Sequence, residues 1–189
     1  TAIVLRKSGL SPLGPVALNT AAPDEGNMYL IGKVGTDEQK ARFLAPLIAG
    51  EARSAFFMSE SADEGGAGSD PSMMKTRARL DGNHWVISGR KAFITGAVGA
   101  EVGIVMANSG TDERLAATMF LVDLPHPAIK VERVLDTIDS AMPGGHAIIA
   151  IDELRVPADQ ILGEVHEGFR YAQVRLSPAR LSHCMRWHG

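Results

Sequence analysis

Cysteine is nearly missing from this 189-residue sequence, whose single example is Cys184. One cysteine excludes a disulfide framework within the chain and fits a reducing compartment. Long apolar runs are also lacking, since HAIIAI at 146–151 is far below the roughly 20 residues of a membrane-spanning helix. The 19 basic residues form no block, and against 22 acidic ones they leave a net charge of −3, which argues against nucleic acid as a partner. With 45% apolar residues, the chain can form the core of one large domain or two small ones.

The first residues of the sequence give no information about targeting. The chain begins at Thr1 rather than at methionine and shows no charged segment followed by an apolar one. We expect either that the start has been removed or that the chain is a piece of a longer protein, so targeting cannot be read from its first residues.

Residues 1–53 are predicted to form helices and connections. The stretch APDEGNMYLIGKVG at 22–35 is typical of a loop with an apolar patch. A helix follows, because Thr36 and Gln39 have the spacing of a capping box. Pro46 predicts a break or kink in this helix before it ends.

Residues 54–163 change to the two-residue period of β-strands. No helical pattern intervenes, so we expect an antiparallel sandwich or barrel rather than a parallel sheet. Asp81-Gly82-Asn83 is a strong hairpin signal, since these residue types tolerate positive φ. The seven strand candidates are RSAFFMS, MMKTRARLD, HWVISGRKAFIT, EVGIVMANS, ATMFLVDL, IKVERVL and GHAIIAIDELRV.

Residues 164–189 return to a helical period, with Pro178 inside the pattern. An amphipathic helix at the end of the chain needs cover, and we expect either a further helical region or a partner to supply it. The predicted apolar stripe consists of Phe169, Ala172, Gln173, Leu176, Leu181, Cys184, Met185 and Trp187.

A glycine-rich loop, ESADEGGAGSDPSMM at 60–74, directly follows the strand SAFFMS. Two interpretations stay open: a solvated turn, or a loop whose backbone amides and Ser69 hydroxyl approach an anion. A Rossmann fingerprint is excluded, because no helix follows and the region is β.

Three motifs occur in order along the chain: FFMSES followed by GAGSD, then WVISGRKAFITGA, then IDELRVPADQILGEVHEGF. Together they resemble the acyl-CoA dehydrogenase family. There, a strand ending in Thr-Glu-Pro precedes a Gly-Ala-Gly-Ser-Asp loop, and later motifs lead to a helix that carries an arginine. GTDEQKARFLAPL and LIAGEARSAFFMSE resemble the family's approach to this region, and APDEGNM resembles a subgroup with long, multidomain animal members. The resemblance covers nearly the whole chain.

The resemblance implies an α+β multidomain fold, in which helical domains flank an antiparallel β-barrel or sandwich. Residues 1–53 would end the first helical domain, 54–163 would form the middle domain, and 164–189 would begin the last, truncated one. FAD would lie along the middle domain with an acyl-CoA thioester against the flavin. In the family, a carboxylate removes the α-proton while the β-hydrogen leaves as hydride to the flavin. The flavin supplies the chemistry, and the protein orients and polarises the flavin.

Partners and location follow from the same resemblance. It implies electron transfer to an electron-transfer flavoprotein, a homodimer or homotetramer, and a role in fatty acid metabolism. The location would be cytoplasmic if the protein is bacterial, and mitochondrial or peroxisomal if it is eukaryotic.

Site residues are also implied by position. Ser69 matches the family's loop serine near the FAD pyrophosphate and the thioester, Phe93 the aromatic that covers the flavin, and Thr95 a hydroxyl at the ring edge. The expected cofactor residues are Phe56, Met58, Ser59, Gly68, Ser69, Phe93, Ile94 and Thr95, and the expected substrate residues are Ser69, Ser177 and Arg180.

Some positions depart from the family pattern. Ser59-Glu60-Ser61 replaces Thr-Glu-Pro, and Ser177 stands where many members have an aspartate. We expect the catalytic base beyond Gly189, so that this chain alone is inactive. A non-catalytic binding or scaffold module, or a flavin oxidase or monooxygenase on the same fold, remains the alternative.

Overall fold

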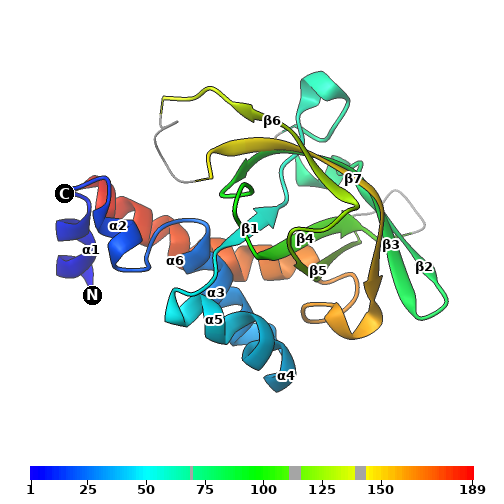
Figure 1. Cartoon of the computed structure of the whole chain (residues 1–189), viewed down its shortest axis with the longest axis horizontal. Helices are drawn as coiled ribbons and strands as arrows, with labels where there is room; N and C mark the ends of the chain where they lie inside the picture. The colour runs from blue at the N-terminus through cyan, green and yellow to red at the C-terminus, as the bar shows by residue number, and fades with distance from the viewer. Residues whose placement is uncertain (69, 111–115, 139–143) are drawn as a thin grey trace.

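The computed structural model describes residues 1–68, 70–110, 116–138 and 144–189, and in it a group of helices lies beside a mixed β-sheet (Figure 1). Both chain ends lie together at the tip of the helical part, away from the sheet (Figure 1). Within these ranges, no helix is both long and apolar enough to cross a membrane. The helices are α1 (Ala2–Ser8), α2 (Gly14–Ala17), α3 (Asp24–Val34), α4 (Asp37–Gln39), α5 (Ala45–Ala49) and α6 (Gly168–Trp187).

The segment predicted as a loop at 22–35 is the helix α3, so that prediction was wrong. Leu30 and Ile31 are fully buried and anchor the helix on the sheet. Gly26, which suggested a loop, instead makes room for Arg175, because a Cβ there would lie 3.2 Å from the guanidinium carbon. Tertiary packing overrides the low helix propensity of glycine at this position.

The capping box at the start of α4 is confirmed. The Gln39 amide donates to the Thr36 hydroxyl at 3.2 Å, and the Thr36 amide donates to the Gln39 side chain at 3.2 Å. The break or kink predicted at Pro46 takes the form of a change in helix type rather than an end of the helix. A π-helical segment, Lys40–Leu44, precedes α5, and Pro46 sits in the first turn of α5, where an amide is not required.

The sheet contains all seven predicted strands, and its order is β1-β4-β2-β3-β7-β6, with β5 paired to β4. The predicted hairpin is confirmed, because Asp81 pairs with His84 around a turn in which Gly82 has φ +63°. The strands are β1 (Ser54–Phe57), β2 (Arg77–Asp81), β3 (His84–Thr95), β4 (Val102–Asn108), β5 (Ala117–Asp123), β6 (Ile129–Leu135) and β7 (His146–Pro157).

The prediction of a purely antiparallel sheet needs correction. Strand β1 runs parallel to β4, and β2 meets β4 in parallel at one residue pair, Arg77 with Asn108. The other pairings are antiparallel. The α+β class stands, and the sheet is mixed because β1 is inserted beside a strand distant in sequence. No observation tests the domain boundaries at 53 and 163, which stay a prediction.

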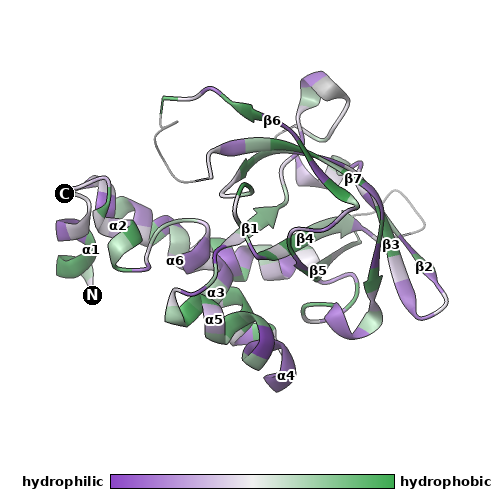
Figure 2. Ribbon diagram, viewed as in Figure 1, coloured by the Kyte–Doolittle hydropathy of each residue, from purple (hydrophilic) through white to green (hydrophobic). Residues whose placement is uncertain are grey.

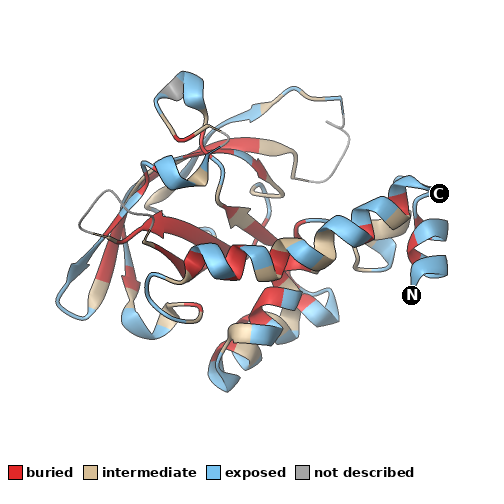
Figure 3. Ribbon diagram, turned by 180° about the vertical axis from the view of Figure 1, so that it is seen from behind, coloured by how far each residue is buried: buried red, intermediate tan, exposed pale blue. Residues whose placement is uncertain are grey.

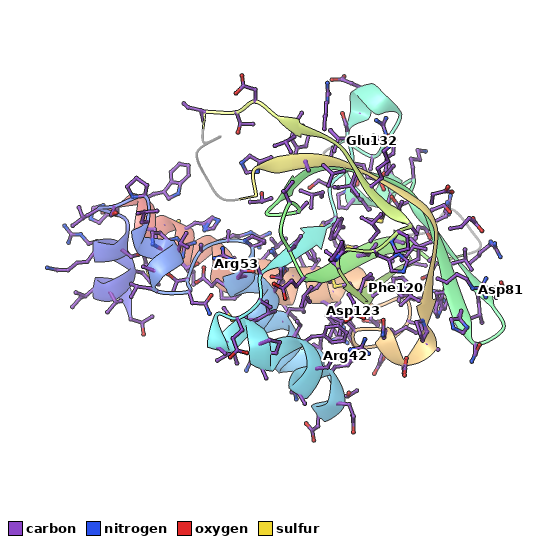
Figure 4. All side chains as sticks on the ribbon, viewed as in Figure 1. Arg42, Arg53, Asp81, Phe120, Asp123 and Glu132 are labelled. Atoms are coloured by element: carbon purple, nitrogen blue, oxygen red, sulfur yellow. The ribbon has the colours of Figure 1, made fainter. Side chains whose placement is uncertain are left out.

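Two hydrophobic clusters lie on opposite faces of the central strands, where green residues concentrate in Figure 2. The first cluster, formed by residues of the strands and their connections, contains Phe57, Trp85 and Phe120. The second, which we call the helix-side cluster because helix residues pack there against the strands, contains Leu30, Met106 and Tyr171. Strand β1 alternates between them, because Ala55 and Phe57 enter the first while Phe56 and Met58 pack against the second. The ion pair of Arg42 with Asp123 also joins helices and sheet, at 2.6 Å (Figure 4).

Of the predicted apolar stripe of α6, Ala172 belongs to the buried face, while the other members do not. Leu181 and Trp187 are 62% and 89% exposed, and Cys184 is exposed too. The helix continues through Pro178 and buries mainly its first half, beside the sheet, together with Ser182 and Arg186 nearer its end (Figure 3). Polar residues of α3 face α6, and polar side chains of α6 are therefore buried against them. The buried residues of α6 are Gly168, Tyr171, Ala172, Arg175, Ser182 and Arg186.

Candidate functional site

The ends of β1 and β3, where most of the predicted cofactor residues lie, are joined. The Ala92 amide donates to the Ser59 carbonyl at 2.9 Å, and the Lys91 amine donates to the Met58 carbonyl at 3.0 Å. Ser59 is exposed just beyond β1, and Met58 is half-buried. Residues 33 positions apart in sequence therefore lie side by side and form one continuous surface.

Phe93 occupies an unusual position in this surface. Its φ is +59°, a conformation that non-glycine residues adopt rarely, and it lies at a register shift between β3 and β7. The irregularity turns the ring outward, where 58% of the residue is exposed, while Ile94 is buried. An exposed aromatic held in strained backbone indicates a functional site.

Thr95, at the end of β3, faces a cleft of about 840 Å³ between the sheet and the N-terminal and C-terminal helices. Its hydroxyl lies 2.8 Å from Nδ1 of His146 on β7. Arg53, Pro23 and Arg186 also line this cleft, and Figure 4 shows Arg53 between the helices and β1. The volume is within the range of small-molecule sites.

The glycine-rich loop closes around an anion that belongs to the protein, the buried carboxylate of Glu60. Its Oε2 accepts from the amides of Ala67 at 3.1 Å and Lys75 at 2.8 Å. Its Oε1 accepts from the amide and hydroxyl of Thr76, at 2.9 and 2.7 Å, and pairs with the Lys91 amine at 3.1 Å. The sequence suggested an anion-binding loop, and the anion found among the described residues is Glu60.

Gly66 is required by this arrangement. A Cβ at Gly66 would lie 2.6 Å from Cβ of Glu60 and 2.9 Å from the Ser61 carbonyl oxygen. Gly68 instead has φ +60°, with space limited by Ala62. Ser69 lies outside the described residues, so pyrophosphate binding by Gly68 and Ser69 stays a prediction.

The Glu60–Lys91 pair has strongly perturbed protonation equilibria. Burial raises the pKa of Glu60, but Lys91 and the hydrogen bonds from Lys75 and Thr76 outweigh it and lower the pKa to about 2. Burial lowers the pKa of Lys91 to about 8, although Glu60 opposes that shift. At neutral pH both side chains are charged. Their contacts hold Met58, the glycine-rich loop and β3 together.

Two of the three predicted substrate residues, Ser177 and Arg180, lie on α6. Ser177 and Arg180 are exposed, and Nη2 of Arg180 reaches the Gln173 side chain at 3.5 Å. Neither residue lines the 840 Å³ cleft. Their contact with substrate stays a prediction.

A buried polar network behind β1 was not predicted from the sequence. Asp24 accepts from the amide and the hydroxyl of Ser54, both at 2.6 Å, and its other oxygen lies 2.7 Å from Nε of Arg53. The side-chain amide nitrogen of Asn27 donates to the Ser54 hydroxyl at 2.9 Å, and its side-chain oxygen accepts from Arg175 at 2.7 Å. The only signal for this network was the polar motif APDEGNM, which supplies Asp24 and Asn27.

Comparisons with known proteins match this architecture. The family model "Acyl-CoA dehydrogenase, middle domain" matches residues 55–143. A probable acyl-CoA dehydrogenase of Mycobacterium tuberculosis is 39% identical over 181 residues, which are 94% of this chain and 44% of that protein. The structure of a putative acyl-CoA dehydrogenase from Mycobacterium abscessus is 38% identical with a TM-score of 0.90, covering 98% of this chain and 46% of the other.

A third relative carries its cofactor. A glutaryl-CoA dehydrogenase from Mycobacterium smegmatis, solved in complex with FADH2, is 29% identical with a TM-score of 0.73, covering 85% of this chain and 39% of the other. The chain therefore spans less than half the length of the relatives it matches.

Proposed function

Because the chain belongs to the acyl-CoA dehydrogenase family, we propose that it forms the flavin-binding part of an FAD-dependent enzyme that oxidises acyl-CoA thioesters between their α and β carbons. The observation that carries this proposal is the joined surface of β1 and β3. There Ser59 and Phe93 are exposed and Thr95 is half-buried. The likeness to the FADH2-bound glutaryl-CoA dehydrogenase supports it.

The residues of this surface fit a flavin. An isoalloxazine ring needs an apolar face and hydrogen-bonding groups at its polar edge. Phe93 supplies exposed aromatic area, and Ser59 and Thr95 supply hydroxyl groups. The strained backbone at Phe93 holds the ring in position before any ligand binds.

Ser59, Phe93 and Thr95 would hold FAD, which when bound would supply the hydride-accepting chemistry of the proposed reaction. The residues of this chain would orient the cofactor and polarise it. The Thr95 hydroxyl, beside His146, faces the cleft and would donate to the polar edge of the flavin, while the exposed Phe93 ring would cover an apolar part of it. Fixed donors of this kind stabilise charge that develops during reaction.

The proton from the α-carbon needs a base, and we assign none among the described residues. The relatives are more than twice as long as the matched part of them. We propose that the catalytic carboxylate belongs to the enzyme portion that corresponds to the rest of their length, so that these 189 residues alone are inactive.

The remaining assignments are proposals that rest on family membership. They are an acyl-CoA substrate in fatty acid metabolism, an electron-transfer flavoprotein as electron acceptor, and a homodimer or homotetramer. The location is cytoplasmic in a bacterium, and mitochondrial or peroxisomal in a eukaryote.

The proposed function is tested by purifying the full-length protein that carries this chain and adding acyl-CoA thioesters without oxygen. We expect bound FAD and bleaching of its absorption by a saturated acyl-CoA. Bound FAD that is never bleached, or no FAD at all, would instead support a binding or scaffold module. Rapid reoxidation by oxygen after bleaching would favour the oxidase alternative.

A further inference from the structure

Arg175 is a buried cation where α6, α3 and β1 meet. The residue is 8% exposed. Its Nε donates to the Asn27 side chain at 2.7 Å, and its Nη2 donates to the Pro23 carbonyl at 3.3 Å. The guanidinium lies 4.0 Å from the centre of the Phe56 ring, a short distance for a cation–π contact.

The charge of Arg175 is not neutralised by a carboxylate in direct contact. Among the described residues, no carboxylate oxygen forms an ion pair with it, and Asp24 in the same network pairs with Arg53. Burial lowers the pKa of Arg175 to about 10, although Asp24 and Glu25 counter part of this shift, so the side chain stays charged at neutral pH. Carbonyl and amide dipoles and the Phe56 ring therefore hold a full positive charge inside the protein.

Helix α3 is shaped to receive this side chain. At Gly26, a Cβ would lie 3.2 Å from Cζ and 3.3 Å from Cγ of Arg175. Asn27, the next residue, accepts from Arg175 and donates to Ser54 at the start of β1. The motif APDEGNM thus supplies both the space and the polar partner for Arg175.

We propose that Arg175 is a positioning residue of the flavin site, which rests on the proposed function. Phe56 lies on the helix-side face of β1, two residues before Met58 and three before Ser59. By clamping Phe56 against α3, Arg175 sets the position of the end of β1 and therefore of the Ser59 hydroxyl. Its fixed charge, behind the strand that meets the cofactor, stabilises the negative charge of reduced flavin relative to the oxidised form.

The test is the reduction potential of FAD in the full-length holoprotein, with Arg175→Met, Arg175→Lys and a control. Arg170→Met is the matched control, because Arg170 is on the same helix and is also stacked on an aromatic ring, at 4.5 Å from Tyr171, but is exposed. FAD affinity and thermal melting are measured alongside on each variant.

We expect Arg175→Met to weaken binding of reduced flavin relative to oxidised flavin on the order of tenfold, which lowers a two-electron potential by about 30 mV. Arg175→Lys keeps the charge and should restore the potential, while its lost Phe56 stacking and Asn27 bond still weaken FAD affinity. Arg170→Met should leave both quantities unchanged.

An unchanged potential in folded Arg175→Met, or a potential that Arg175→Lys does not restore, would overturn the inference. If Arg175→Met does not fold, the same comparison is made with Arg175→Lys and Asn27→Ala. Asn27→Ala should weaken FAD affinity. Wild-type FAD affinity in both variants would overturn the inference that Arg175 clamps Phe56 against α3. A wild-type protein that binds no FAD would instead overturn the proposed function itself.

Discussion

At the scale of single residues, the ion pair of Glu60 with Lys91 is the contact of the candidate site whose loss should lower stability most. The side chains are 2% and 0% exposed, and the pair joins β1, the glycine-rich loop and β3. Removing one partner leaves the other charge buried without compensation, which is much more costly than losing a surface pair.

Glu60→Gln should therefore lower the free energy of unfolding by about 3–5 kcal/mol, because Lys91 remains buried without its charged partner. Urea denaturation measures this loss. Asp81→Asn is the control, since it removes an exposed pair with Arg155 and should cost far less. Equal losses in the two variants would contradict the role given to the buried pair.

The same carboxylate predicts a pH dependence of stability. Because the pKa of Glu60 is lowered from 4.5 to about 2 in the folded protein, its contribution is fully present above pH 4.5 and is lost as the pH falls toward 2. A shift of this size corresponds to about 3 kcal/mol. Unfolding midpoints measured between pH 6 and pH 2 should fall steeply in wild type and less steeply in Glu60→Gln, and parallel profiles would refute this assignment.

At the scale of elements, the glycine-rich loop allows a matched test of cofactor binding. Gly68 and Gly82 have nearly the same φ, +60° and +63°, but Gly68 lies in this loop and Gly82 in the β2–β3 hairpin. Alanine at either position should cost about 1–2 kcal/mol of stability, because both glycines are left-handed. Only Gly68→Ala should also weaken FAD binding, and melting with FAD titration separates the two effects.

If Gly68→Ala and Gly82→Ala bind FAD equally well, the loop serves only to hold Glu60. That outcome would return Gly68 to a structural role and leave the Glu60 contacts unaffected.

Strands were predictable from the sequence, while their pairing and the helix faces were not. Alternating apolar residues and turn residues such as Gly82 are local signals, so all seven strands were found. The parallel pairing of β1 with β4 depends on contacts between distant segments. Helix α3 was missed because Gly26 and Asn27 are typical of loops, although here they receive Arg175.

The site was predictable only in part, for a similar reason. The resemblance named Phe93 and Thr95, and the structure places both at the end of β3, with Phe93 exposed and Thr95 on a cleft. The roles of Glu60 and Arg175 were not visible, because a charged residue in a sequence gives no sign of whether it will be buried. Their positions depend on the packing of the helices against the sheet.

At the scale of the whole molecule, the candidate flavin site depends on both layers. The sheet supplies Phe93 and Thr95, and the helices close the cleft that Thr95 faces and support β1 through Arg175. The central claim is that FAD binds where these layers meet, at the joined ends of β1 and β3.

Titration of the full-length apoprotein with FAD, in wild type, Thr95→Ser and Thr95→Val, tests that claim most directly. Losing the hydroxyl should cost about 1 kcal/mol, which is roughly a fivefold weaker affinity. We predict that Thr95→Val binds FAD about fivefold more weakly or shifts its absorption, while Thr95→Ser behaves as wild type. Equal affinity and identical flavin spectra in all three proteins, with unchanged melting, would contradict this placement of the cofactor.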